Sequence, residues 1–362
     1  MSLIIFILLL VALIVVHEFG HFGVAKLFGI KVEEFGIGFP PRIAGIQIGE
    51  TLYSINILFF GGFVRIFGET KGEGEHDARS FARKSKWIQA AVVSAGIFCN
   101  LIFAWLILST GYMVGLPTSS EHIGIGTVQD AKATIVGIIP NSPAEKSKMN
   151  AGDSIVSITT GANVVDDPKT AQEAQDFIQA HQDESLVIKT QSEKGTQSNF
   201  VVKAESGLIA GKKAVGIQLD DVGILRLSPP LALYEGALLT WNMTQSTATG
   251  LVTFFAQIFR GTADFSSVAG PIGIASIGSQ AVSNGFSAAV SLVALISINL
   301  ALINILPIPG LDGGRVLIIV LEGLTKRRMS DKWLLWLSMA GFGALILLML
   351  VVSYHDILRL IG

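Results

Sequence analysis

Four long apolar runs alternate with polar stretches along the chain. The runs cover residues 3–21, 87–113, 286–306 and 333–353. As a helix, a run of about 20 apolar residues is long enough to cross the roughly 30 Å hydrocarbon core of a bilayer. The pattern therefore predicts four transmembrane helices.

The segment between the first two runs has a different pattern. Within residues 46–67, the stretch YSINI at 53–57 alternates between apolar and polar residues, and Gly61-Gly62 marks a turn or a close approach. This predicts a β-hairpin or small sheet. An open strand edge in lipid would leave backbone groups unpaired, so we expect the element to lie beside the helices or to be covered. An ordinary cytosolic hairpin is the alternative interpretation.

A polar insert separates the second and third apolar runs. Strand-like stretches occur at 133–139, 151–158, 186–190 and 200–202, and residues 170–180 have a helical pattern. We therefore expect an inserted α+β domain.

Residues 231–259 are apolar but are interrupted by several polar side chains. They predict either one poor transmembrane helix or an interfacial helix. The even number of crossings that puts both basic loops on one side favours the interfacial interpretation.

These elements predict a polytopic α-helical membrane protein with about four transmembrane helices, a membrane-associated β element and an inserted domain. The expected divisions are an N-terminal membrane part at 1–114, the α+β insert at 115–223, interfacial helices or a linker at 224–285, and a C-terminal membrane part at 286–362.

Composition and charge refine this picture. Half of the residues are hydrophobic and only 15% are charged, as expected of an integral membrane protein. Residues 26–86 contain nine Lys and Arg, and residues 326–332 contain four, so both loops are expected to be cytoplasmic. Residues 121–221 contain nine lysines against fourteen acidic residues, which suits an extracytoplasmic domain. No basic face with interleaved aromatic residues is visible, so no nucleic-acid partner is expected.

The first apolar run ends in HEFGH at residues 17–21. Residues four apart lie on one face of a helix, so His17 and His21 can hold one Zn²⁺ while Glu18 lies beside the metal as a general base. A chance match, or two histidines satisfied in a protein core, is the alternative. Ionisable residues at membrane depth cost roughly 3 kcal/mol or more each and usually mark function, which favours a metal site.

A third zinc ligand is expected far away in the sequence. The only cysteine is Cys99, so the ligands must be histidines and carboxylates. Asp312 lies in NILPIPGLDGGR at 304–315, where prolines and glycines break the third apolar run. Irregular backbone at membrane depth is tolerated only where protein or a water-filled cavity covers it. Asp312 is thus predicted to be a ligand, with a helix N-cap as the alternative.

Several motifs occur together and in a specific order. They are HEFGH at 17–21, GIG followed by FPP at 36–41, GGFVR at 61–65, AG followed by Asn100 at 95–100, GPIG at 270–273, and the segment from Asn304 to Gly313. With these motifs the chain resembles the site-2 protease family of intramembrane zinc metalloproteases, peptidase family M50, and closely its bacterial RseP-like branch.

The resemblance implies roles residue by residue. His17, His21 and Asp312 are the expected zinc ligands, Glu18 is the expected catalytic base, and Asn299 and Asn304 are expected to contact substrate. It also implies a location in the bacterial inner membrane and single-pass membrane substrates, shortened first by another protease, of the anti-sigma factor or remnant signal peptide type.

The insert resembles one PDZ domain of the protease-associated type. The likeness rests chiefly on AGDSIVSI at 151–158, whereas Thr160-Gly161 replaces the usual Asn-Gly and Met149 a commoner Leu. The resemblance implies a module that gates access or binds C-termini, with an unidentified ligand; a plain spacer domain is the alternative.

The function predicted from these features is a zinc-dependent endopeptidase that performs regulated intramembrane proteolysis. A helical substrate must be unwound first, so we expect Ile55, Asn56 and Ile57 to offer a strand edge to it, with Asn299 and Asn304 bonding its freed backbone. Two other classes remain open: a non-catalytic membrane scaffold that binds tails through the PDZ-like domain, and a transporter, whose broken helices also carry midplane polar residues.

Overall fold

The computed structural model describes residues 1–69, 76–122, 124–161, 163–209, 212–262, 268–326 and 331–361. The chain divides into two compact units. The first comprises residues 1–108, 237–280 and 292–362, and the second comprises residues 109–236 with 281–291.

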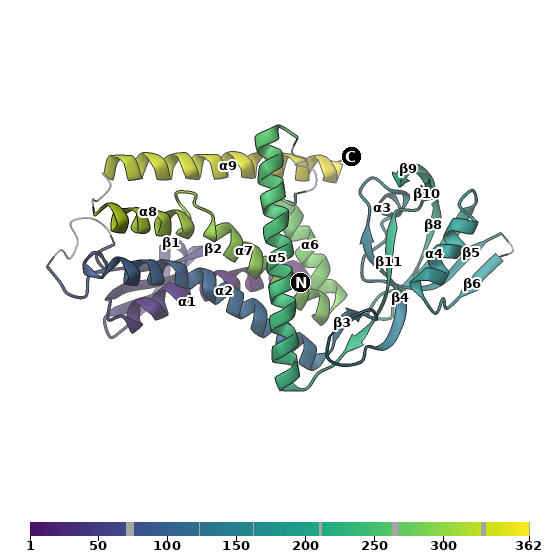
Figure 1. Ribbon diagram of the computed structural model, residues 1–362, viewed down its shortest axis with the longest axis horizontal. Coiled ribbons are helices and arrows are strands. Elements are labelled where there is room, and N and C mark those ends of the chain that lie inside the picture. The colour runs from purple at the N-terminus through teal and green to yellow at the C-terminus, as the bar shows by residue number, and fades with distance from the viewer. Residues whose placement is uncertain are drawn as a thin grey trace. The chain divides into compact units, whose positions relative to one another are not determined.

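Long apolar helices dominate the first unit (Figure 1). They are α1 (Ser2–Leu27), α2 (Lys86–Val114), α7 (Phe286–Ile305), α8 (Asp312–Thr325) and α9 (Asp331–Ile361). Residues 109–114 of α2 and 286–291 of α7 are assigned to the second unit. Among the described residues, four helical stretches are long and apolar enough to cross a membrane: Ser2–Leu27, Lys86–Val114, Phe286–Ile305 and Met339–Leu358. The predicted four membrane-spanning helices are confirmed on this criterion, with the fourth placed later in α9 than the sequence suggested. Arg327 and Arg328 of the predicted basic loop lie outside the described residues.

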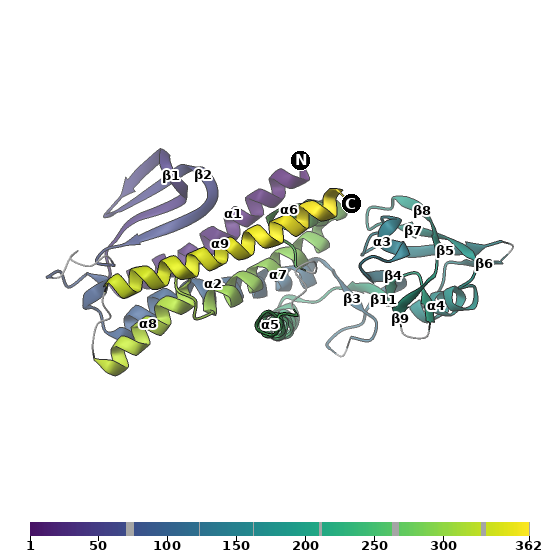
Figure 2. The same cartoon turned by 90° about the horizontal axis from the view of Figure 1, so that it is seen from above.

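The amphipathic stretch after the insert forms one continuous helix, α5 (Pro229–Arg260). It is not among the four candidate spans. From residue 237 onward α5 belongs to the first unit. It runs across the direction of α9 in Figure 1 and is seen end-on in Figure 2, where α7 and α9 are seen lengthwise. A helix perpendicular to the spanning helices lies along the bilayer surface, so this geometry favours the interfacial interpretation.

The segment GPIG at 270–273, one of the motifs of the family resemblance, begins a helix, α6 (Pro271–Asn284). The buried carboxylate of Asp356 on α9 stabilises this start. Its Oδ1 accepts a hydrogen bond from the N–H of Gly270 at 3.1 Å, and its Oδ2 accepts one from the N–H of Gly273 at 2.8 Å. A side chain at either glycine would come within 2.8 Å of this carboxylate. A carboxylate at a helix N-terminus accepts hydrogen bonds from the free backbone N–H groups and is attracted to the positive end of the helix dipole.

The β element between α1 and α2 consists of β1 (Val32–Ile48) and β2 (Thr51–Ile66), which pair with each other. Both strands bend, so that Phe35 pairs with both Tyr53 and Val64. The predicted β-hairpin is therefore confirmed. Figure 2 shows β1 and β2 next to α1.

The register of this sheet corrects the expected position of its open edge. Ile55 pairs with Ile37 on one side and with Ala44 on the other, so its segment is internal. The edges are instead the segments 42–48 and 62–66, each of which has a single partner segment among the described residues. The bend of the strands, which alternation cannot reveal, causes this difference.

The second unit is built around a sheet with strand order β3-β11-β4-β5-β7-β8, and β6 pairs with β5. Its strands are β3 (Leu116–Ser119), β4 (Gln129–Ile138), β5 (Ser154–Thr160), β6 (Asn163–Asp166), β7 (Ser185–Gln191), β8 (Gln197–Lys203) and β11 (Ile217–Leu225). Helices α3 (Pro143–Lys146) and α4 (Ala171–Ala180) and the hairpin of β9 (Glu205–Ile209) and β10 (Lys212–Ala214) complete it.

The strands and the helix predicted for the insert are confirmed as β4, β5, β7, β8 and α4. Helix α4 starts where the hydroxyl of Thr170 accepts a hydrogen bond from the N–H of Glu173 at 3.2 Å, a regular N-cap. Apolar side chains from the sheet and from α4, such as Ile135, Ile158 and Ile188, form one buried core. The unit is thus an α+β domain, and its identity as a PDZ domain stays a prediction.

The contact between Asp356 and α6 gives a test of stability. Replacing Asp356 with Ala leaves the N–H groups of Gly270 and Gly273 without their acceptor, and we expect the free energy of unfolding to fall by about 2–4 kcal/mol. Asp356→Asn keeps one acceptor oxygen, so its free energy of unfolding should fall by less than that of Asp356→Ala. Thermal unfolding in detergent can be followed by labelling of Cys99, the only cysteine. Wild-type unfolding temperatures for both variants would contradict this role.

Candidate metal centre

Three side chains from two distant segments converge at one point of the first unit. The Nε2 atoms of His17 and His21 lie 3.2 Å apart. Oδ2 of Asp312 lies 3.1 Å from Nε2 of His17 and 3.3 Å from Nε2 of His21. Both histidines are buried, at 8% and 9% exposure. The structure therefore brings together the three ligands predicted from the sequence.

The spacing of these atoms suits a zinc ion. Ligands at 2.0–2.1 Å from a tetrahedral Zn²⁺ lie roughly 3.3 Å from one another. The three atoms of His17, His21 and Asp312 are 3.1–3.3 Å apart, so they form one face of such a tetrahedron. Oδ2 of Asp312 is also buried without a hydrogen-bond partner. Two imidazoles and a carboxylate are ligands that zinc prefers, and they leave a fourth position for water.

Asp312 reaches the histidines because the chain breaks between α7 and α8. Helix α8 begins at Asp312, its N-cap is Leu311, and no side chain caps the helix. The N-cap alternative for Asp312 is therefore wrong, because its carboxylate is directed at the histidine pair instead. The turn is tight: a Cβ on Gly313 would lie 2.3 Å from the carbonyl oxygen of Ile305. Only glycine fits this close approach.

Contacts with other helices hold the break in place. A Cβ on Gly341 of α9 would lie 2.1 Å from the carbonyl oxygen of Pro309, so α9 packs directly on the loop. Lys86 of α2 forms an ion pair with Glu322 of α8 at 2.6 Å. Arg315 of α8 pairs with Glu69, which follows β2. Contacts with α9, with α2 and with the segment after β2 thus hold α8 and the metal ligand Asp312 in place.

Helix α2 packs closely against the histidine face of α1 at two glycines, Gly20 of α1 and Gly96 of α2. A Cβ on Gly20 would lie 2.5 Å from the carbonyl oxygen of Ala95, and a Cβ on Gly96 would lie 2.5 Å from Nε2 of His21. This contact brings hydrogen-bond partners to both imidazoles. Nδ1 of His21 lies 2.9 Å from the carbonyl oxygen of Val92. The motif at 95–100 supported the family resemblance, but sequence reasoning gave its residues no role.

Glu18 lies beside the metal cluster and is not part of it, as expected for a base that follows the first ligand. Its side chain is partly buried, and its Cγ lies close to the sheet edge: a Cβ on Gly62 would be 3.2 Å from it. The edge segment 62–66 of β2 therefore approaches the site directly.

The residues expected to bind substrate are more dispersed. The Asn299 side chain donates to the carbonyl oxygen of Leu295 in its own helix at 3.0 Å, and Asn304 is partly buried in the last turn of α7. Asn56 is buried and donates to the carbonyl oxygen of Gly38 at 3.1 Å, so it supports the sheet. Ile55 and Ile57 are about half exposed, at 47% and 53%. Their substrate contacts stay predictions.

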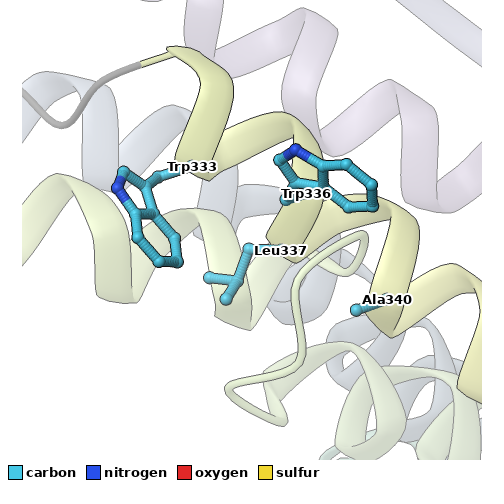
Figure 3. A pocket seen from close by; sticks show the side chains of 4 residues that line it. All are labelled: Trp333, Trp336, Leu337 and Ala340. Carbon is cyan, nitrogen blue, oxygen red and sulfur yellow. The ribbon is translucent and has the colours of Figure 1, made fainter.

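A separate hollow of about 620 Å³ lies on α9 and is lined by Trp333, Trp336, Leu337 and Ala340 (Figure 3). Both indole side chains are 70% exposed. Tryptophans are enriched at membrane interfaces, so this apolar surface suits the edge of a bilayer. None of the lining residues belongs to the metal cluster.

The contact at Gly96 gives a sharp test of the centre. We expect Gly96→Ala to deplete the bound zinc, because the added methyl group would lie 2.5 Å from Nε2 of His21 and 2.7 Å from Cε1 of His17. Gly23→Ala is the matched control, since a Cβ at Gly23 of α1 meets nothing within 4 Å. Metal content of the purified proteins is the measurement. Equal zinc in both variants would show that this contact does not shape the centre.

Comparison with known proteins agrees with this geometry. The family model for peptidase family M50 matches residues 5–349. A protein of Clostridium perfringens assigned as a zinc metalloprotease is 31% identical, over 96% of each chain. Zinc metalloprotease RasP of Bacillus licheniformis is 25% identical over 99% of each chain. The chloroplastic membrane metalloprotease ARASP of Arabidopsis thaliana is 30% identical over 87% of this chain and 69% of its own. The family resemblance found in the sequence is confirmed, and the chain belongs to peptidase family M50.

Proposed function

We propose that this M50 peptidase is a zinc-dependent intramembrane endopeptidase that cleaves single-pass membrane proteins within their transmembrane segments. The observation that carries the proposal is the convergence of His17, His21 and Asp312, with HEFGH on a helix that is apolar enough to span a membrane. The zinc metalloprotease names of its relatives support the same chemistry. Polar ligands are costly in such helices, so their convergence indicates a catalytic role.

The chemistry follows from the positions of these groups. His17, His21 and Asp312 would hold a zinc ion, which would supply the Lewis acidity that makes a water molecule at the site more acidic. Glu18 accepts the proton from this water as the oxygen attacks the carbonyl carbon of the scissile peptide bond. Glu18 then delivers that proton to the amine nitrogen as the carbon–nitrogen bond breaks. The products are a new carboxyl group, which keeps the second proton of the water, and a new amine; transfer of that proton between them gives a carboxylate and an ammonium group.

The edge of the β element provides a way to present the substrate. The amide bonds of a transmembrane helix are shielded by their own hydrogen bonds, so cleavage requires an extended stretch. A strand edge can hold such a stretch through main-chain hydrogen bonds. The proposed edge is the segment 62–66 of β2, which lies next to Glu18, in place of the internal segment that contains Ile55. Asn299 and Asn304 are proposed to bond the backbone groups that the substrate releases.

The orientation in the membrane rests on charge. The basic loops around 26–86 and 326–332 are proposed to be cytoplasmic, and the acidic α+β domain is proposed to be extracytoplasmic. In a bacterial inner membrane this domain, which resembles a PDZ domain, would meet the outer part of a substrate before cleavage. The proposed substrates are proteins already shortened on that side, of the anti-sigma factor or remnant signal peptide type.

The first test of the function uses Glu18→Gln in reconstituted membranes with a tagged single-pass substrate. Loss of the base should reduce cleavage by at least about 10²-fold. Zinc content should remain at the wild-type level, because Glu18 is not part of the ligand cluster. A zinc chelator should abolish cleavage by the wild type. Full activity of Glu18→Gln would contradict a protease at this site and would favour the scaffold class.

The second test maps the strand edge. In the Glu18→Gln background, a photoreactive phenylalanine analogue replaces Phe63 on the proposed edge, or Ile46 on the opposite edge as the matched control. We expect the substrate to crosslink from position 63 and not from position 46. Crosslinking from position 46 alone would show that the substrate uses the other edge.

A further inference from the structure

The second nitrogen of the His17 imidazole has an unusual partner. Nδ1 of His17 lies 3.1 Å from the side-chain amide nitrogen of Asn100 on α2. Asn100 is fully buried, and Ser297 of α7, also fully buried, donates from its Oγ to the backbone oxygen of Asn100 at 2.8 Å. Asn100 is therefore held between two helices with its side chain directed at the metal ligand.

The two imidazoles differ in which ring nitrogen carries the proton. The partner of Nδ1 in His21 is the carbonyl oxygen of Val92, which only accepts hydrogen bonds. The proton of His21 must therefore be on Nδ1, and the lone pair of Nε2 faces Asp312. The partner of His17 is an amide, which can either donate or accept. With the amide nitrogen facing it, Nδ1 of His17 accepts and the ring proton is on Nε2.

Zinc coordination requires the opposite tautomer of His17. Nε2 must offer its lone pair to the metal, so Nδ1 must carry the proton and needs an acceptor. The Oδ1 atom of Asn100 is buried and has no hydrogen-bond partner among the described residues. A half-turn of the amide exchanges the positions of oxygen and nitrogen within nearly the same volume. No hydrogen bond of Oδ1 is lost by this rotation.

We propose that Asn100 is a positioning residue for the metal centre. Its Oδ1 accepts the hydrogen bond from Nδ1–H of His17 and thereby fixes the tautomer and the ring orientation in which Nε2 binds zinc. The inference rests on the zinc chemistry of the proposed function and adds a residue to it. Partners of this kind typically change metal affinity by about 10- to 100-fold.

A purely structural role explains the geometry less well. Asn100 is linked to α7 through its backbone oxygen, so its side chain is not needed for that contact. Its amide makes no hydrogen bond other than the one to His17 in the part of the chain that the structure describes. A leucine of similar size would preserve the packing and remove only the acceptor.

The experiment measures zinc affinity of the purified full chain by competition with a chelator, without any substrate. We expect Asn100→Leu to weaken zinc binding by about 10- to 100-fold. Asn100→Asp keeps an acceptor oxygen and should bind zinc at least as tightly as the wild type. The absorption bands of bound Co²⁺ provide a second readout, because they report on the tetrahedral geometry of the ligands. Cys99→Ala, at the neighbouring position of α2, should change neither quantity.

Wild-type zinc affinity in Asn100→Leu would overturn the proposal, as would equal weakening in Asn100→Asp and Asn100→Leu. Asn100→Ala provides the same comparison if the leucine variant does not fold. Because the assay contains no substrate, it is separate from the test of cleavage. A wild-type chain that binds zinc and cleaves nothing would contradict the proposed proteolysis and leave the role of Asn100 intact.

Discussion

The close approach of α1 to α2 is the constraint on which the rest of the centre depends. At Gly20 and Gly96 the two helices meet without intervening side chains, and any Cβ there would collide with a backbone carbonyl or with an imidazole ring. This contact helps to bury His17 and His21 and brings Val92 and Asn100 within hydrogen-bond distance of the rings. Buried polar groups are costly unless they are paired, so the two glycines make the burial of His17 and His21 possible.

The second requirement is a break in the helical backbone at the right depth. Helix α7 ends at Ile305 and α8 begins at Asp312, so a short loop carries the third ligand to the histidines. Helix α9 packs on this loop at Gly341 and, fifteen residues later, holds the start of α6 through Asp356. A single helix thus contacts both the metal-ligand loop and the helix that begins with the GPIG motif.

The β element adds a strand edge to a site made of helices. Because β1 and β2 bend, the segment that contains Ile55 is enclosed and the segment that contains Gly62 is an edge beside Glu18. A hydrolytic site needs an extended peptide, whereas a membrane favours helices because they satisfy their own backbone. We propose that the edge beside Glu18 reconciles these demands, because a strand edge can offer an unwound substrate new partners for its lost hydrogen bonds.

The sequence by itself determined the features that depend on local spacing. The apolar runs located the spanning helices, the interval of four residues placed His17 and His21 on one face, and the prolines near Asp312 required a helix break. Alternating stretches also located β4, β5 and β7 in the inserted domain. Features that depend on contacts between distant segments were decided only by the tertiary structure. The internal position of Ile55 follows from the bending of the strands. The hydrogen bonds from the start of α6 to Asp356 join residues more than 80 positions apart in the sequence. The proposed role of Asn100 depends on the contact between α2 and α1. Hydrophobic periodicity indicates which face of a helix or strand is buried, but it does not indicate which side chains of other elements will contact that face.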